Sequence, residues 1–316
     1  MPSDVKPLGV GVIGSGPFRQ FVFERLSVRR DFAATACWSP SEDAHPSTHR
    51  DDCVNHSSPQ DVIDNPHTSV IFFVGPVAIT LVAAAIQAGK HVVLELARSL
   101  TPPDLRHLAG LAAEREIVAV VDEPRRWDDD FLCAKSVFDS GQLGRLERIR
   151  LAIHERSLPG EVFPQGVLRE LGCHWLDQLL VFVHDEPQSV RRRTFQRPES
   201  ATDEGFLTVI DFAGGVSAVI EVQTQSLLSL RTGWLLEGTA GAYRAGRLYT
   251  KTADGEIVDE PVSRPPNSGD SVSSDPFFDN LAAAIIGDAD AQATLPDLAH
   301  VARVAELAGS IVESNE

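Results

Sequence analysis

Short runs of apolar, mostly β-branched residues alternate with helical patterns through the first third of the chain. The runs at residues 8–13, 32–37, 70–74, 91–94 and 117–121 predict buried strands, and the segments 17–26, 78–88 and 102–114 predict helices between them. The last of these helices begins with Thr101 as N-cap and Pro102 at its first helical position. Strands and helices in alternation require right-handed crossovers. The pattern therefore predicts a doubly wound parallel sheet of Rossmann type over residues 1–122.

The pattern changes after Asp122. Residues 146–154 and 190–260 alternate apolar and polar positions, with turn signals at Gly214-Gly215 and Asp254-Gly255, which predicts a mainly antiparallel sheet. A polar loop over 261–275 and helices at 276–286 and 295–312 follow. We therefore expect an α/β protein with an N-terminal doubly wound domain (1–122) and a C-terminal α+β domain (123–316) carrying an open sheet. The last helices could pack back on the first domain.

Charge and cysteine usage narrow the class of protein. The 316 residues, 43% of them hydrophobic, suffice for about two domains. A net charge of -17 would repel a phosphate backbone, so we expect no nucleic-acid partner. Cys37, Cys53, Cys133 and Cys173 form neither a C-x-x-C pair nor a zinc pattern, and the first residues do not resemble a signal peptide. We expect a cytoplasmic protein with reduced thiols and no membrane association.

The turn after the first predicted strand has the composition of a dinucleotide-binding loop. It carries the run Gly14-Ser15-Gly16-Pro17-Phe18-Arg19. Glycines here allow a tight turn and let a pyrophosphate approach the helix N-terminus. The third position of the motif, usually Gly or Ala, is Arg19, whose side chain must turn outward or reach into the cleft. A purely structural turn is the alternative interpretation.

The second predicted strand ends without the carboxylate that binds the ribose hydroxyls of NAD. Trp38 and Ser39 stand there instead. One interpretation is that Trp38 stacks on adenine while Ser39, together with Arg19, accepts a 2′-phosphate, which favours NADP over NAD. The other is that Trp38 covers a ribose pocket that is not used.

Five motifs occur in order along the chain. They are Val12-Ile13-Gly14-Ser15-Gly16, Ala88-Gly89-Lys90-His91-Val92-Val93-Leu94-Glu95, Arg125-Arg126-Trp127, Ser140-Gly141-Gln142-Leu143-Gly144 and Glu170-Leu171-Gly172-Cys173-His174-Trp175-Leu176-Asp177. Together they resemble the Gfo/Idh/MocA oxidoreductase family, named for glucose–fructose oxidoreductase and inositol dehydrogenase, over the whole chain.

The resemblance implies a cofactor, a substrate class and an assembly. NAD or NADP would be bound by Gly14, Gly16, Phe18, Arg19, Trp38, Ser39, Gly75, Pro76 and Glu95. The substrate would be a small molecule of the sugar or polyol class. A homodimer or homotetramer would form through the C-terminal sheet, because an apolar open face needs a cover. The apolar residues expected on that face are Phe206, Val209, Ile210, Val219, Ile220 and Val222.

The chain departs from the family pattern on the nicotinamide side of the cleft. Family members usually carry Glu-Lys-Pro after the fourth strand, with the lysine near nicotinamide and substrate, whereas this chain has Glu95-Leu96-Ala97. Leu96 offers neither a hydrogen bond nor a positive charge to a developing alkoxide. The Thr-Pro turn of the family is Gly75-Pro76 here.

Glu170, His174 and Asp177 are spaced i, i+4 and i+7, so on one continuous helix they would form a single polar stripe. The resemblance matches Glu170 and His174 to the family's Asp-x-x-x-His pair, in which histidine takes the hydroxyl proton while hydride leaves for nicotinamide. We expect His174 to act as acid and base, with both carboxylates favouring its protonated form and fixing its orientation. The alternatives are a satisfied polar network or a metal site, and we expect no metal.

Two functions are compatible with this sequence. One is an NAD(P)-dependent oxidoreductase that acts on a sugar, polyol or related hydroxyl compound. The other is a catalytically degenerate dinucleotide- or sugar-binding sensor or regulatory protein. Leu96, the missing ribose carboxylate and the missing third glycine favour the second.

Overall fold

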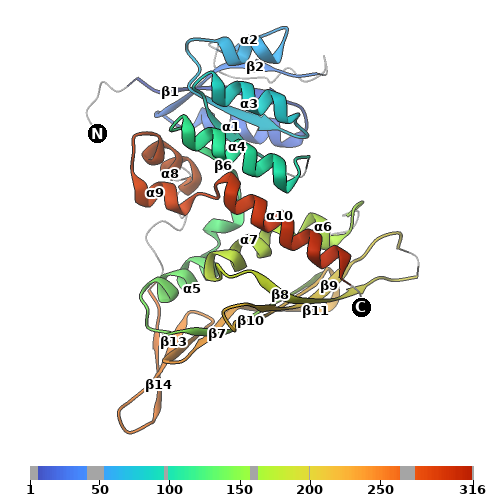
Figure 1. Ribbon diagram of the computed structural model, residues 1–316, viewed down its shortest axis with the longest axis vertical. Coiled ribbons are helices and arrows are strands. Elements are labelled where there is room, and N and C mark those ends of the chain that lie inside the picture. The colour runs from blue at the N-terminus through green and yellow to red at the C-terminus, as the bar shows by residue number, and fades with distance from the viewer. Residues whose placement is uncertain are drawn as a thin grey trace. The chain divides into compact units, whose positions relative to one another are not determined.

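The chain forms two compact units in the computed structural model, which describes residues 6–40, 53–95, 99–156, 163–198, 200–263 and 275–314 (Figure 1). The first unit combines Met1–Glu123 with Gly269–Arg303, and the second combines Pro124–Ser268 with Val304–Glu316. None of the helices formed by the described residues has the length and apolar character that crossing a bilayer requires.

A six-stranded parallel sheet with the order β3-β2-β1-β4-β5-β6 forms the centre of the first unit. Its strands are β1 (Leu8–Gly14), β2 (Phe32–Trp38), β3 (Val54–Asn55), β4 (Val70–Val74), β5 (His91–Leu94) and β6 (Ala119–Val121). The connecting helices are α1 (Pro17–Ser27), α2 (Pro59–Asp64), α3 (Ile79–Gln87) and α4 (Pro102–Glu114). Every residue of β4 is buried, as its continuous apolar run predicts. The expected doubly wound fold is confirmed.

Three elements of this unit were not predicted: β3, α2 and the C-terminal helix α9 (Ala289–Thr294). Strand β3 has only two residues, both exposed, so it carries no apolar signal. Helix α2 is short, but its start has a recognisable sequence pattern. Ser58 accepts a hydrogen bond from Asp61 N while Asp61 accepts one from Ser58 N, with Pro59 at the first helical position. This capping box was the available signal for α2.

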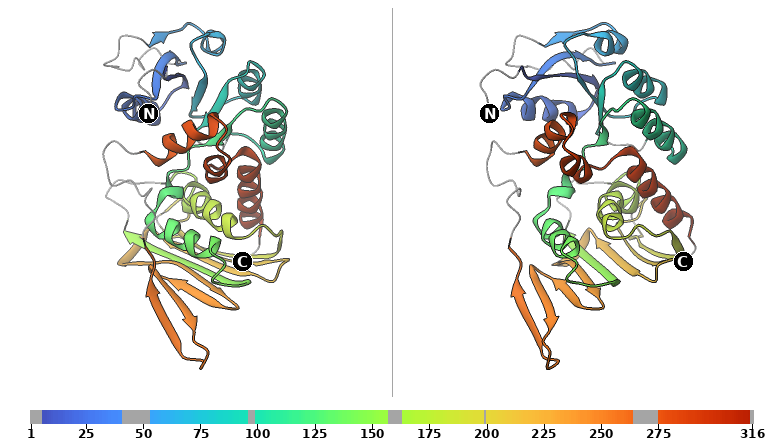
Figure 2. Two further views of the ribbon diagram at one scale, coloured as in Figure 1. Left: turned by 90° about the vertical axis from the view of Figure 1, so that its left-hand side faces the viewer. Right: turned by 60° about the vertical axis from the view of Figure 1, so that its left-hand side comes forward.

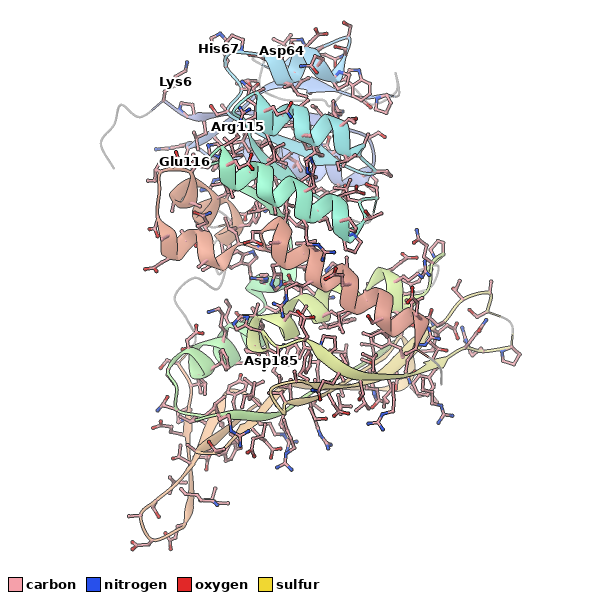
Figure 3. All side chains as sticks on the ribbon, viewed as in Figure 1. Lys6, Asp64, His67, Arg115, Glu116 and Asp185 are labelled. Carbon is pink, nitrogen blue, oxygen red and sulfur yellow. The ribbon has the colours of Figure 1, made fainter. Side chains whose placement is uncertain are left out.

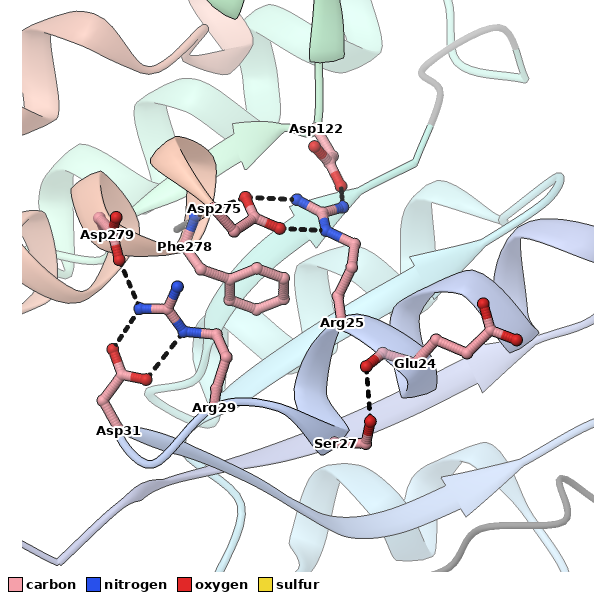
Figure 4. A network of polar contacts seen from close by, with 9 residues as sticks. All are labelled: Glu24, Arg25, Ser27, Arg29, Asp31, Asp122, Asp275, Phe278 and Asp279. Carbon is pink, nitrogen blue, oxygen red and sulfur yellow. Dashed lines mark hydrogen bonds and ion pairs between the residues drawn. The ribbon is translucent and has the colours of Figure 1, made fainter. Parts of the chain in front are cut away.

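The C-terminal helices α8 (Pro276–Ile285) and α9 (Ala289–Thr294) belong to the first unit. Arg25 of α1 pairs with Asp122 and, at 2.5 Å, with Asp275, and Arg29 binds Asp31 and Asp279 at 2.6 Å each (Figure 4). The expected second domain of residues 123–316 therefore loses residues 269–303 to the first unit. The physical reason is that these helices complete the core and ion pairs of the parallel sheet.

The second unit contains an eight-stranded sheet with the order β14-β13-β12-β11-β7-β10-β9-β8. Its strands are β7 (Leu146–Arg156), β8 (Pro187–Phe195), β9 (Gly205–Phe212), β10 (Ser217–Gln223), β11 (Gln225–Gly238), β12 (Gly241–Arg244), β13 (Arg247–Lys251) and β14 (Ile257–Pro261). Only the central pair of β10 with β7 is parallel. The predicted mainly antiparallel sheet is confirmed, and both expected turns lie between paired strands.

Helices cover one face of this sheet (Figure 2). They are α5 (Asp129–Asp139), α7 (Gly172–Phe182) and the last part of α10 (Leu298–Glu313). The short helix η1 (Pro124–Trp127) precedes α5, and the short helix α6 (Val167–Glu170) precedes α7. Their apolar side chains and those of the sheet form one core.

The other face of the sheet differs from the expected apolar surface. Phe206, Ile210, Ile220 and Val222 are at most 1% exposed and lie in the core under the helices. On the opposite face, where Figure 3 shows many side chains with nitrogen and oxygen tips, Val209 and Val219 are partly exposed. The strands also carry the exposed ion pairs Arg148–Glu237 and Arg191–Asp211. The expected apolar open face is therefore wrong, because strand alternation directs four of its six residues inward. Assembly into a dimer or tetramer stays a prediction, and an apolar sheet face no longer supports it.

Candidate cofactor and catalytic sites

The glycine-rich turn lies at the carboxyl end of β1, next to the point where strand order reverses. Gly14 has φ +125, and a Cβ there would stand 1.9 Å from Val74 O, so the close approach of β1 and β4 requires glycine. Gly16 is the N-cap of α1 with φ +122, and a Cβ there would meet no atom within 4 Å. The space over Gly16 is thus open at the N-terminus of an 11-residue helix, which is where a pyrophosphate would bind.

Gly75, Pro76 and Glu95 lie beside this turn at the ends of β4 and β5. Gly75 has φ +75, and its N–H donates a 2.7 Å hydrogen bond to Glu95 Oε2. A Cβ on Gly75 would stand 2.8 Å from Ser15 O. The glycine-rich turn therefore lies together with Gly75 and Glu95 at the carboxyl ends of the parallel strands. Leu96, which stands where the family pattern has a lysine, lies outside the described residues.

Arg19 turns into the interior of the first unit and is only 4% exposed. Its guanidinium carbon lies 5.3 Å from the centre of the Phe23 ring and its charge acts on the Cys37 thiol. The expected contact of Arg19 with a 2′-phosphate therefore loses its geometric basis, because a phosphate ligand has to reach the cleft. Trp38 and Ser39, which end and follow β2, remain half-buried and accessible to a ligand.

The helix that carries Glu170, His174 and Asp177 is interrupted. Glu170 ends α6, Leu171 separates the two helices, and His174 lies in the first turn of α7. The expected continuous stripe is therefore wrong in its geometry. A Cβ on Gly172 would stand 3.2 Å from the Leu168 side chain and 3.4 Å from the Phe206 ring. The chain therefore packs closely against the core at this break.

The three polar residues have different surroundings. Glu170 Oε1 accepts a 2.7 Å hydrogen bond from Gln165 N, which fixes the loop before α6. Asp177 is 4% exposed and accepts two hydrogen bonds from Arg126, at 2.5 Å from Nε and 3.0 Å from Nη2. His174 is half-buried. Asp177 thus neutralises a buried guanidinium, and the catalytic role expected for it stays a prediction.

A cavity of about 390 Å³ in the second unit, lined by both polar and apolar side chains, was not predicted from the sequence. Gln178 is one of its lining residues, accepting a 2.8 Å hydrogen bond from Trp234 Nε1 and donating to Arg125 O. Arg125 lies over the Trp175 ring at 5.2 Å. Gln178 is one helical turn after His174, so the two share a face of α7. The lining includes Arg125, Asp128, Asp130, Trp175, Gln178, Thr232 and Trp234.

The comparisons with known proteins agree with this arrangement. Residues 131–244 match the sequence model of the GFO/IDH/MocA C-terminal domain. An uncharacterized oxidoreductase of Schizosaccharomyces pombe is 35% identical over 118 residues, which are 35% of this chain and 32% of that protein. The scyllo-inositol 2-dehydrogenase (NADP(+)) IolW of Bacillus subtilis is 32% identical over 145 residues, or 43% of this chain and 40% of that protein.

These matches span less than half the length of either relative, so they do not carry the activity of the whole relative to this chain. A solved structure of an NAD-binding protein from Listeria innocua matches 98% of this chain and 95% of its own with a TM-score of 0.75, at 22% identity, and shows the same fold. Over residues 131–244 the chain is therefore similar to the C-terminal domain of the GFO/IDH/MocA proteins, and as a whole it shares the fold of the solved NAD-binding protein.

Proposed function

We propose that the protein is a nicotinamide-dependent oxidoreductase that acts on a hydroxyl group of a sugar or polyol. The observation that carries this proposal is the open glycine turn at the N-terminus of α1, held against β4 by Gly14 and bordered by Gly75 and Glu95. The relative from Bacillus subtilis, named as an inositol dehydrogenase using NADP⁺, supports the substrate class.

The residues of the first unit fit a dinucleotide. The open space over Gly16 would take the pyrophosphate, and Trp38 with Ser39 would take the adenosine half. Bound nicotinamide supplies the acceptor for the hydride of the substrate carbon. The lack of a carboxylate at the end of β2 favours NADP, although Arg19 is not available to its 2′-phosphate.

His174 receives the hydroxyl proton of the substrate in this proposal. Imidazole is suited to this transfer because its ordinary pKa lies near neutral pH. Glu170 acts as a positioning residue, since its hydrogen bond from Gln165 fixes the loop before α6, the short helix that leads into α7. The cavity one turn away supplies aromatic rings and polar groups, the combination that a polyol requires.

Titration with NADH and NADPH tests the cofactor site. Binding is measured by the rise in thermal stability and by the quenching of tryptophan fluorescence. Gly16→Ala should weaken binding at least tenfold, because a side chain would enter the pyrophosphate space. Gly89→Ala is the matched control, since Gly89 also has positive φ and open surroundings but lies at the end of α3. Equal binding by both variants, or no binding by the parent protein, would overturn the proposal.

Turnover tests the catalytic residues. His174→Ala should abolish polyol-dependent NAD(P)H formation, while Asp128→Asn at the cavity rim should raise KM with little change in kcat. Asp139→Asn, an exposed carboxylate elsewhere on the second unit, is the control. Unchanged turnover in His174→Ala would remove this residue from the mechanism.

A sensor or regulatory protein is the second candidate. The inward orientation of Arg19 and the absence of a ribose carboxylate favour it, since both are departures in the cofactor site. This candidate predicts cofactor or sugar binding without turnover of any polyol tested. Leu96→Lys then discriminates: a gain of dehydrogenase activity indicates a degraded active site, and no gain favours the regulatory role.

A further inference from the structure

Asp203 binds the start of α6 from a loop that is distant in the sequence. Its carboxylate Oδ2 accepts a 2.9 Å hydrogen bond from Leu168 N, and its backbone carbonyl accepts one of 3.2 Å from Val167 N. Val167 and Leu168 open α6, and the first N–H groups of a helix have no partner within it. Gly166, the N-cap of α6, has no side chain that could accept them. Asp203 therefore caps α6 across 35 positions of sequence.

The chain around Gly166 leaves room for this carboxylate. Gly166 has φ +89, and a Cβ there would stand 2.0 Å from Asp203 Oδ1, so a side chain at this position would collide with the cap. Thr202 Oγ1 donates a 2.8 Å hydrogen bond to Phe163 O, which joins the same two loops a second time. A helix of four residues, as α6 is, depends on such tertiary contacts for its stability.

Backbone hydrogen bonds connect the capped turn to His174. Leu171 N donates to the carbonyls of both Val167 and Leu168, the two residues that Asp203 binds. Leu171 O in turn accepts a 3.2 Å hydrogen bond from His174 N, in the first turn of α7. Because Leu171 is the residue at which the two helices meet, loosening of α6 would displace the start of α7.

We propose that Asp203 is a positioning residue for His174. This inference rests on the proposed function, in which His174 takes the proton of a substrate hydroxyl. Such a transfer needs the two heavy atoms within about 2.6–3.2 Å of each other. A displacement of about 1 Å can lower a rate by about a hundredfold. The cap on α6 keeps His174 at that distance, so its loss should slow turnover more than it weakens binding.

The kinetic experiment follows NAD(P)H formation by the full chain from scyllo-inositol, myo-inositol, glucose and sorbitol. Asp203→Ala should lower kcat by about tenfold or more, with KM changed by less than about threefold. Asp203→Asn keeps an oxygen that can accept from Leu168 N, so its kcat should stay within about threefold of the parent's. Asp211→Ala, at the other end of β9, is the control, since Asp211 also accepts two hydrogen bonds, from Ser189 and Ser217.

Gly166→Ala tests the same contact from the opposite side, and it serves if Asp203→Ala does not fold. Its Cβ would displace the Asp203 carboxylate, so kcat should again fall by about tenfold. Gly215→Ala is the matched control, because Gly215 has a similar φ of +86 and no described atom within 4 Å of the Cβ position. Hydrogen exchange checks the geometry without turnover: Asp203→Ala should accelerate the amides of residues 167–174 and leave those of β10 unchanged.

His174→Ala separates this inference from the proposed function. If His174→Ala is inactive while Asp203→Ala and Gly166→Ala keep the parent's kcat, the role of Asp203 is overturned and the proposed function stands. The role is also overturned if Asp203→Asn is as slow as Asp203→Ala, or if Asp211→Ala loses as much kcat. A parent that oxidises none of the four compounds, or a fully active His174→Ala, would defeat the proposed function and the positioning role together.

Discussion

The Arg126–Asp177 pair is the most enclosed ion pair within the described part of the second unit, with side chains 6% and 5% exposed. Removing one partner of a buried pair leaves an uncompensated charge, so Asp177→Asn should lower the free energy of unfolding by about 3–5 kcal/mol. Replacing both partners by apolar residues, as in Arg126→Met/Asp177→Leu, should recover most of that loss. Denaturant unfolding followed by tryptophan fluorescence measures both.

Asp139→Asn is the control for this pair, because its bridge to Lys135 is exposed and should be worth under about 1 kcal/mol. A loss as small as this in Asp177→Asn would show that Asp177 is not a structural counter-ion. A catalytic or positioning role toward His174 would then be the better explanation.

Asp122 shows burial acting against ion pairing. Burial raises the pKa of Asp122 to about 6, although Arg25 favours the carboxylate. A folded-state pKa above the unfolded value means that the folded protein holds the proton more tightly. The stability from this group is therefore complete below about pH 4 and is lost as the pH rises through about 6.

Comparison with Asp122→Asn isolates this effect from the other carboxylates. The unfolding free energy of the parent, minus that of the variant, should fall by roughly 2 kcal/mol between pH 4.5 and 7.5. Urea titrations at the two pH values measure it. A difference that grows with pH would mean that attraction to Arg25 outweighs the cost of burial.

Helix caps act at the scale of a single element, and α4 has a complete one. Thr101 Oγ1 accepts from Asp104 N at 3.3 Å, and Asp104 accepts from Thr101 N at 2.9 Å. Thr101→Ala should cost about 1 kcal/mol of unfolding free energy, whereas Thr101→Ser keeps the hydroxyl and should cost a few tenths. Thermal or denaturant unfolding compares them, and equal losses would show that the hydroxyl contributes nothing.

The sequence predicts elements best where one physical signal dominates. Buried strands such as β4 follow from apolar runs, and α4 follows from its cap. The break at Leu171 was not predictable from spacing, because it depends on how Gly172 packs against Phe206 of a distant strand. Periodicity reports which residues would share a face of a helix, and tertiary packing decides whether the helix is continuous.

The candidate site shows the same limit at the scale of the whole molecule. Gly14, Gly16 and Glu95 could be predicted because a tight turn needs glycine wherever it occurs. The inward orientation of Arg19 could not, since the motif does not show that its guanidinium packs over the Phe23 ring. The cavity around Gln178 also depends on long-range contacts, with Trp234 fifty-six positions away.

Phe278 packs against residues of the first unit that lie more than 200 positions before it in the sequence. It is completely buried, with its ring centre 5.0 Å from that of Phe32 and 5.5 Å from that of Phe72, and Arg25 lies over it at 4.7 Å. Phe278→Ala should cost about 3–5 kcal/mol, because it removes a ring from a closed core.

The loss should appear in the parallel sheet, although residue 278 is far from it in sequence. Hydrogen exchange of the amides in β1, β2 and β4 should accelerate by orders of magnitude, while the amides of β9 and β10 should change little. Phe21→Ala is the control, because Phe21 is 47% exposed on α1 of the same unit. If β9 and β10 lost protection as much as β1, the chain would unfold as one cooperative body, and α8 would not belong to the first unit alone.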